Sequence, residues 1–421
     1  MKNPIFLKPI IDELMKLEYG LIVKQNSIQS KLLYFFVLIG IFDKPARAAV
    51  LNLVNSTGYY GCLKCSQEGI VIDTKRGVFL VFKNFVYKRF LLIFIRLGGH
   101  VHIFPFQKGP LDPCFPSRDD KSYVEDCKNA SNKENSHGVN GKTVLSKLKY
   151  FKPTVCTNID YMHSILEGVM KRFFKYWFEE TVRDTDKYKF SLKHHAEEIN
   201  RRLLNIRVPT FIPVTPRSIH DFKLWRAKEF LSFLIYYLLP IFYDLMEPIY
   251  LINITKLVVA MEFLLRRKIF KSELKYVKNI LIDVKEVEEI YPPHIMLSGM
   301  HEILHLVDCT FCLGPLNCVC CFLYEEINRK IVNLIHSNDL IGTEFLLNFS
   351  VLQSLEVFCE SNNTNNPVFN EFINKHNIIR TSNKKRINEE KCILGPLISL
   401  TDQFELISNK IDLNGIDRSE I

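Results

Sequence analysis

Two pairs of potential metal ligands, far apart in the chain, constrain its fold more than any other feature. Cys62 and Cys65 form a CxxC motif, and His301 and His305 form an HxxxH motif. Two thiolates and two imidazoles are a common ligand set for a structural zinc ion. If one ion binds all four side chains, the two ends of a long insertion must meet in the folded protein.

The local sequence around each pair favours metal binding. Residues 58–65 read GYYGCLKC, and glycines on both sides of an aromatic pair predict a tight knuckle that directs two thiols toward one metal. We expect a helix over residues 297–308, where the i, i+4 spacing puts His301 and His305 on one face. A single CxxC motif needs two further ligands, and this helix offers them.

An acidic residue accompanies each pair: Asp43 precedes Cys62 by 19 residues, and Glu325 follows His305 by 20 residues. The run Leu32–Phe42 (LLYFFVLIGIF) leads into Asp43 and is continuously apolar, which predicts a buried central strand of a parallel or mixed sheet. Open α/β sheets place working residues at the C-terminal ends of such strands. The alternative is that Asp43 only caps the helix that Pro45 opens.

The composition indicates a globular protein with an anionic partner. A length of 421 residues accommodates two to three domain-sized units, and 47% apolar residues with a mean hydropathy of +0.02 indicate a real core. The net charge of +9 and the pI of about 8.8 favour nucleic acid as the partner. The longest apolar stretches are too short or interrupted by Pro240 and Asp244, so we expect no membrane span.

The 12 cysteines are expected to be metal ligands or buried thiols. No secretory signal opens the chain, since Met1–Lys16 mixes charged residues and proline with apolar ones. A reducing compartment is therefore expected, and disulfides are not.

Apolar spacing predicts a largely helical chain. We expect helices over residues 5–18 and, within a helical region at 143–285, over 160–178, 216–239 and 251–265. Residues 78–97 fit either a strand pair or an amphipathic helix, and residues 117–141 fit a polar surface loop. A helix is expected around Glu325 and another after residue 345, followed by an exposed tail over 361–391.

Two other metal arrangements compete for the histidines. His301–His305 is literally HEILH, which matches the HExxH motif of zinc proteases, where the glutamate between the histidines activates water. Glu302 would then be the base, and Glu325 or Glu326 the third ligand. Alternatively, Cys309 and Cys312 complete a local site with the histidines, although that spacing is too compact to wrap a tetrahedron easily.

At GYYGCLKC and at IDYMHSILEGVMKRFFKYWF the chain resembles the CACTA (En/Spm-like) transposases. The resemblance covers most of the chain, and its elements occur in order. They are FLKPIIDEL at 6–14, FDKPAR at 42–47, GYYGCLKC at 58–65, HGVNGKTVLSKL at 137–148, DYMHSILEGV at 160–169, PRSIHDFKLWRAKEFLSFLIYYLLP at 216–240, HEILHLVD at 301–308, GPL at 314–316 and YEE at 324–326.

The resemblance implies an α/β fold that is mostly α by content. An incomplete RNase H-like core would be interrupted by a large all-helical insertion, which a zinc site pins. The implied segments are a partial core with the knuckle (1–66), an irregular insertion (67–142), a helical insertion domain (143–300), the HxxxH motif with the returning glutamate helix (301–345) and a C-terminal helix with a basic tail (346–421).

The resemblance also implies the site residues and their metals. Family members carry an Asp-Asp-Glu triad that binds Mg²⁺ or Mn²⁺, and Asp43 resembles its second aspartate and Glu325 its glutamate. Cys62, Cys65, His301 and His305 resemble the ligands of a structural zinc. Asp160 and His163 match the family's DxMH element, and either chemistry or helix packing would explain them.

The first aspartate of the triad has no counterpart in this sequence. The acids before Asp43 are Asp12, Glu13 and Glu18, and they fall in the helix that normally follows the missing strand. We therefore expect a truncated, catalytically incomplete transposase-derived protein in the nucleus, which binds DNA and takes no small-molecule substrate. Transposases of this type commonly act as dimers, so it is the resemblance, and not the residues, that implies a homo-oligomer. The alternatives are a non-catalytic DNA- or protein-binding remnant and an HExxH protease.

Basic side chains of the helical insertion are candidate phosphate contacts in either DNA-binding hypothesis. The alternative is that they lie on solvated helix faces. They are Lys171, Arg172, Lys175 and Arg266–Lys268.

Overall fold

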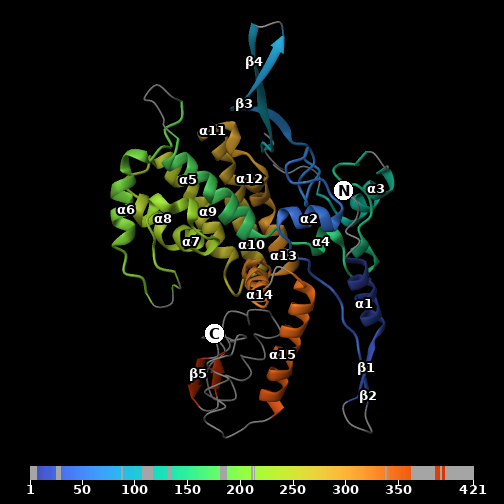
Figure 1. The fold of residues 1–421 in the computed structure, drawn as a ribbon. Coiled ribbons are helices and arrows are strands. Elements are labelled where there is room, and N and C mark those ends of the chain that lie inside the picture. Colours follow the sequence, from blue (N-terminus) through green and yellow to red (C-terminus); the bar gives the residue numbers. More distant parts are fainter. Residues whose placement is uncertain are drawn as a thin grey trace. The chain divides into compact units, whose positions relative to one another are not determined.

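The computed structural model of the chain describes residues 7–24, 30–86, 89–106, 117–130, 134–180, 187–209, 212, 214–336, 339–361, 385–388 and 391–393. The chain forms two compact units, Met1–Cys320 and Cys321–Ile421. The structure is mostly helical, with small two-stranded sheets among the described residues (Figure 1). The α/β class with mostly helical content is thereby confirmed.

The first unit begins with helix α1 (Leu7–Tyr19), as the apolar spacing predicts. Its buried Ile11 packs in a small core with Leu51 of α2, with Leu63 beside the cysteine pair and with Phe151. The hairpin of β1 (Leu21–Lys24) and β2 (Ser30–Leu33) follows.

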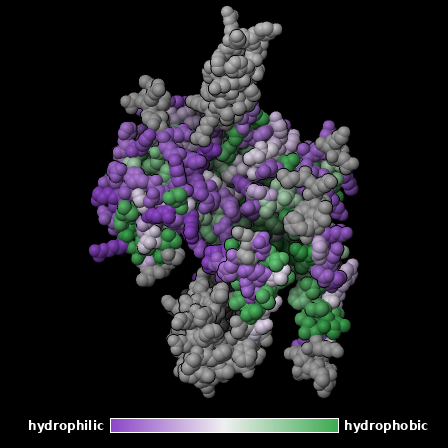
Figure 2. All heavy atoms as spheres, viewed as in Figure 1, coloured by the Kyte–Doolittle hydropathy of each residue, from purple (hydrophilic) through white to green (hydrophobic). Residues whose placement is uncertain are grey.

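The prediction of a buried central strand over Leu32–Phe42 is wrong. Its first two residues end β2, and Tyr34, Phe35 and Leu38 have 53%, 47% and 60% of their surface exposed. Figure 2 shows apolar surface where β1 and β2 lie. An apolar run becomes a buried strand only if strands pair with it on both sides. The sequence pattern does not reveal whether such neighbours exist. Here the only pairing between the end of β2 and Asp43, among described residues, is a parallel bridge of Gly40 with Thr157.

Helix α2 (Lys44–Leu51) starts at Asp43 with Pro45 in its first turn, as expected. Residues 78–97 belong to an antiparallel strand pair, β3 (Ile70–Val86) and β4 (Arg89–Ile103), so the strand-pair alternative holds. The predicted loop over 117–141 is partly wrong, because α3 (Asp120–Asn129) lies within it. Tyr123 and Asp126 of α3 are buried, which a polar sequence did not suggest.

The predicted helical region is confirmed. In Figure 1 the helices α5 (Lys171–Phe178) to α9 (Pro248–Leu264) gather on one side of the first unit and α1 to α4 (Pro153–Cys156) on the other. Helices α12 (Ser298–Glu302) and α13 (Leu306–Leu313) lie between them. The elements are η1 (Val144–Lys147), α4 (Pro153–Cys156), the π-helix η2 (Met162–Met170), α5 (Lys171–Phe178), η3 (Lys193–His195), α6 (Ala196–Leu204), η4 (Ile219–Leu224), α7 (Ala227–Ser232), the π-helix η5 (Phe233–Tyr237), α8 (Leu238–Phe242), α9 (Pro248–Leu264), α10 (Lys271–Asp283), η6 (Val284–Glu286), α11 (Val287–Ile290) and η7 (Pro293–Ile295).

Aromatic side chains fill the core of this helical region. Phe173 stacks on Trp177, and the Trp177 indole donates a hydrogen bond of 2.8 Å to the Tyr291 hydroxyl. Phe174 contacts Phe230 and Phe233 edge to face. Such ring pairs stabilise beyond their buried area, and the buried indole has the partner that it requires.

The helix predicted over 297–308 is interrupted. It consists of α12 (Ser298–Glu302), the 3-10 turn η8 (Ile303–His305) and α13 (Leu306–Leu313), after which η9 (Leu316–Cys318) closes the first unit. The second unit contains α14 (Phe322–Val332), α15 (Ile341–Ser361) and the short strands β5 (Lys385–Asn388) and β6 (Lys391–Ile393). Most of the predicted tail over 361–391 lies outside the described residues.

Within the described ranges, no single helix is long and apolar enough to cross a membrane. Taken together, the bent pair Ser298–Leu313 and Leu316–Val332 meets the length and composition criteria.

Candidate metal centre

The four predicted metal ligands converge in the first unit. The ligand atoms of Cys62, Cys65, His301 and His305 all lie within 4.8 Å of one another. The His301 Nε2 atom lies 3.2 Å from the Cys65 sulfur and 3.2 Å from the His305 Nε2 atom. Ligands placed tetrahedrally at zinc bond lengths lie about 3.3–3.8 Å apart. The four side chains can therefore hold one metal ion between them.

A tight turn presents the two thiols, as the glycines predict. A Cβ atom on Gly61 would come within 2.7 Å of the Ser56 carbonyl, so only glycine fits directly before Cys62. The Lys64 amide lies 3.3 Å from the Cys62 sulfur. The backbone thus brings an N–H donor to one sulfur while the turn folds the other toward the histidines.

The site is closed to solvent, and its environment favours the thiolate of Cys62. The exposed fractions are 4% for Cys62, 0% for Cys65, 1% for His301 and 4% for His305. Burial alone would raise the pKa of Cys62, but its hydrogen bond with Cys65 and the nearby imidazoles of His305 and His301 outweigh it. The pKa of Cys62 therefore lies well below its usual range, and the thiolate is the form that binds metal.

A buried ion-pair cluster adjoins the metal ligands. The Glu302 carboxylate accepts hydrogen bonds of 2.5 Å from Arg47 and 2.5 Å from Ser164, and lies 3.0 Å from the Lys44 ammonium. Burial would raise the pKa of Glu302, but Lys44 and Arg47 outweigh it and lower the pKa to about 2. Because Glu302 follows His301 directly, this cluster ties the histidine helix to the start of α2 and to η2.

Lys64 connects the cysteine knuckle to the segment before η2. Its ammonium donates hydrogen bonds of 2.6 Å to the Thr154 carbonyl and 2.7 Å to the Thr157 carbonyl. On the other side, Arg118 donates to the Cys65 carbonyl at 3.2 Å and lies 3.3 Å from the Asp126 carboxylate. Both sides of the knuckle are therefore held by cationic side chains.

The predicted acidic residues Asp43 and Glu325 lie outside the group of four metal ligands. Asp43 caps α2, because its Oδ1 atom accepts a hydrogen bond of 2.7 Å from the Ala46 amide. Glu325 lies on α14, in the second unit. Asp160 is buried, and its Oδ2 atom accepts hydrogen bonds from the His163 amide at 3.0 Å and the His163 Nδ1 atom at 2.6 Å.

The competing metal arrangements receive less support. The histidine Nε2 atoms group with Cys62 and Cys65, while Cys309 is buried elsewhere in the helix and Cys312 is exposed. The protease hypothesis requires Glu302 to activate water, yet its carboxylate is 1% exposed and engaged by two cations.

Two of the predicted phosphate contacts have partners within the chain. Lys171 pairs with Glu167 one helical turn away. Arg266 lies 3.7 Å from Glu262 and stacks on the Phe263 ring. These contacts agree with the solvated-face alternative for both residues.

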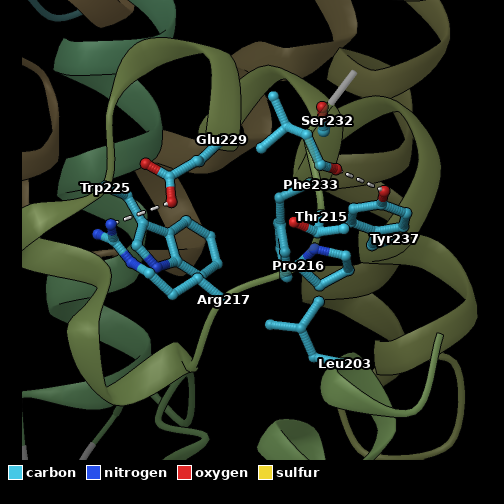
Figure 3. A pocket seen from close by; sticks show the side chains of 10 residues that line it. Leu203, Thr215, Pro216, Arg217, Trp225, Glu229, Ser232, Phe233 and Tyr237 are labelled. Carbon is cyan, nitrogen blue, oxygen red and sulfur yellow. Dashed lines mark hydrogen bonds and ion pairs between the residues drawn. The ribbon is translucent and has the colours of Figure 1, made fainter. Parts of the chain in front are cut away.

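A small pocket in the helical region contains none of the predicted site residues (Figure 3). Arg217 lies 3.4 Å from Glu229 along one wall, and Tyr237 donates a hydrogen bond of 3.4 Å to the Val214 carbonyl. Its polar groups serve local packing between α6 and α7.

Sequence reasoning missed the residues that anchor the metal ligands, namely Lys44, Arg47, Lys64 and Ser164. A weak signal existed, because Lys44 and Arg47 lie one turn apart next to Asp43 and so share a face of α2. Their partner Glu302 lies 255 residues after Arg47, and the sequence does not connect them.

Comparison with known proteins gives no match. No family model fits the chain, and neither a curated protein nor a solved structure is significantly similar to it.

Proposed function

We propose that the chain is a zinc-stabilised DNA-processing protein of transposase ancestry. The observation that carries the proposal is the convergence of Cys62 and Cys65 with His301 and His305. That convergence is what the resemblance to CACTA transposases requires, and chance motifs would have no reason to meet. The bound metal is a structural zinc, since four protein ligands leave no open position for water.

The helical region between the two ligand pairs corresponds to the insertion of an RNase H-like nuclease core. In support, the chain between the ligand pairs is helical from η1 to η7, and the four ligands meet in the first unit. By the resemblance, Asp43 is the proposed second aspartate of the catalytic triad and Glu325 its proposed glutamate. Mg²⁺ or Mn²⁺ bound there would supply activation of the attacking oxygen on a phosphodiester.

DNA is the proposed partner, because the net charge of +9 favours a polyanion. Binding is tested by fluorescence anisotropy with duplex DNA over a range of salt concentrations. The logarithm of the binding constant should fall steeply and linearly with the logarithm of the salt concentration. Binding that is absent at low salt contradicts the proposal.

Catalysis is tested by nicking of supercoiled plasmid in the presence of Mn²⁺. Asp43→Asn removes the charge while an amide oxygen can still cap α2, and Asp119→Asn at the start of α3 is the matched control. Cleavage lost only in Asp43→Asn supports a catalytic protein. Salt-dependent DNA binding without cleavage supports instead the non-catalytic remnant. The localisation is proposed to be nuclear, where the DNA substrate lies.

A further inference from the structure

Two chain segments far apart in sequence run parallel in the first unit. The Gly40 amide donates a hydrogen bond of 2.8 Å to the Cys156 carbonyl, and the Asn158 amide donates one of 3.1 Å to the Gly40 carbonyl. These bonds form the parallel bridge between Gly40 and Thr157. Parallel segments have their carboxyl ends on the same side.

Each of these segments ends in an aspartate at the same distance from the bridge. Asp43 follows Gly40 by three residues, and Asp160 follows Thr157 by three residues. Each aspartate stands at the start of a helix, α2 in the first case and η2 in the second. The two carboxylates therefore leave the parallel pair at the same end.

A second set of contacts places the two helix starts together. Lys44 follows Asp43, Ser164 lies in the first turn after Asp160, and both side chains contact the Oε2 atom of Glu302. The separations are 3.0 Å for the Lys44 ammonium and 2.5 Å for the Ser164 hydroxyl. The starts of α2 and η2 therefore approach one another at Glu302.

Both carboxylates are held in place before any ligand binds. The Ala46 amide fixes Asp43, and the His163 amide and ring nitrogen fix Asp160. Carboxylates that bind metal ions are themselves held in orientation by hydrogen bonds from neighbouring groups. The side chain of Asn158 is fully buried, and its amide oxygen is of the type that binds divalent cations. Its Oδ1 atom has no hydrogen-bond partner among the described residues. In an extended segment it shares a face with Asp160, two residues later.

We propose that Asp160 and Asp43 together bind a divalent cation of the Mg²⁺ or Mn²⁺ type, with His163 as a positioning residue. Asp160 thereby supplies the carboxylate partner for Asp43 that no acidic residue before Asp43 provides. The inference rests on the proposed function for its role in phosphodiester chemistry. Two carboxylates balance the charge of one divalent cation, while Lys44 and the two helix N-termini favour a phosphate beside it.

The site is tested by titrating the zinc-loaded full chain with Mn²⁺ and following free Mn²⁺ by electron paramagnetic resonance. Asp160→Asn and Asp43→Asn should each weaken Mn²⁺ binding at least tenfold. Asp119→Asn, which removes the same charge at another helix cap, should leave binding unchanged. Mn²⁺ affinity in Asp160→Asn equal to that of the control overturns the proposal.

A measurement on the unaltered chain guards against a variant that fails to fold. Bound Mn²⁺ should broaden the ring signals of His163 in the NMR spectrum more strongly than those of His220, which pairs with Glu197. Sharp His163 signals at saturating Mn²⁺ also overturn the proposal.

Plasmid cleavage, measured in parallel, separates this proposal from the proposed function. If Mn²⁺ binding depends on Asp160 but no plasmid is cleaved, the cation site is supported and the proposed catalytic function is contradicted. Cleavage that is indifferent to Asp160→Asn retains catalysis and rejects this site.

Discussion

The Glu302 carboxylate lies 2.5 Å from the Arg47 guanidinium, and both side chains are buried. The pair joins the helix that carries the two histidines to the helix that Asp43 caps. Removing one charge of a buried pair leaves the other uncompensated, which is among the larger effects of a single substitution. The metal centre is therefore supported by electrostatics as much as by its own ligands.

Replacing Glu302 with glutamine should destabilise the first unit by about 3 kcal/mol or more, because Arg47 and Lys44 lose their buried counter-charge. Urea unfolding measures the change. Glu326→Gln, on an exposed helix face with Arg329 as partner, is the control and should change stability by less than about 1 kcal/mol. A similar loss of unfolding free energy in both variants would contradict the stabilising role of the Glu302 ion-pair cluster.

Zinc content should be one ion per chain in the purified protein and should fall to near zero in Cys62→Ser. The physical reason is that three remaining ligands and a hydroxyl bind zinc weakly at neutral pH. Cys312→Ser is the control, because Cys312 is exposed and lies outside the ligand group. Elemental analysis measures the zinc content, and equal zinc content in both variants would refute the assignment of Cys62 as a zinc ligand.

Gly299→Ala should destabilise the contact between α12 and η2 by about 1–3 kcal/mol. A Cβ atom at Gly299 would approach the Ser164 carbonyl to 2.9 Å, which forces the two helices apart. Gly342→Ala is the matched control, since that helical glycine has nothing within 4 Å. Thermal unfolding should show a lowered midpoint for Gly299→Ala alone.

Two carboxylates on the helical region should titrate near pH 2. Hydrogen bonds from Arg201 and Arg202 lower the pKa of Glu198 to about 2, and Arg202 lowers that of Asp244 to about 2. Because both values lie below those of an unfolded chain, the stability that these two groups contribute is complete above about pH 5 and is lost as the pH falls through about 2. NMR titration of the carboxyl carbons measures both values.

Arg202→Ala separates the two carboxylates. The pKa of Asp244 should return to its ordinary range, whereas Glu198 keeps Arg201 and should remain low. An Asp244 pKa that stays near 2 in this variant would show that another group lowers it.

The sequence predicted the features that depend on local chemistry. Helical spacing identified α1 and the helices between residues 143 and 285. The CxxC and HxxxH motifs, which contain Cys62 and His301, could be assigned to one metal site because thiolates and imidazoles are both zinc ligands. Whether a segment is buried depends on its neighbours in space, so the apolar run before Asp43 was misread as a central strand. The partner of Arg47 was unreadable for the same reason, because only the folded chain brings Glu302 to it.

The separation of the ligands also sets an order for biosynthesis. Cys65 and His301 are 236 residues apart, so the knuckle leaves the ribosome long before the histidines exist. Closing so large a loop costs chain entropy, which packing of the intervening helices offsets. A nascent chain interrupted before residue 305 would present two reactive thiols with no partner ligands. An ion held by all four side chains can therefore bind only once nearly the whole first unit has been made.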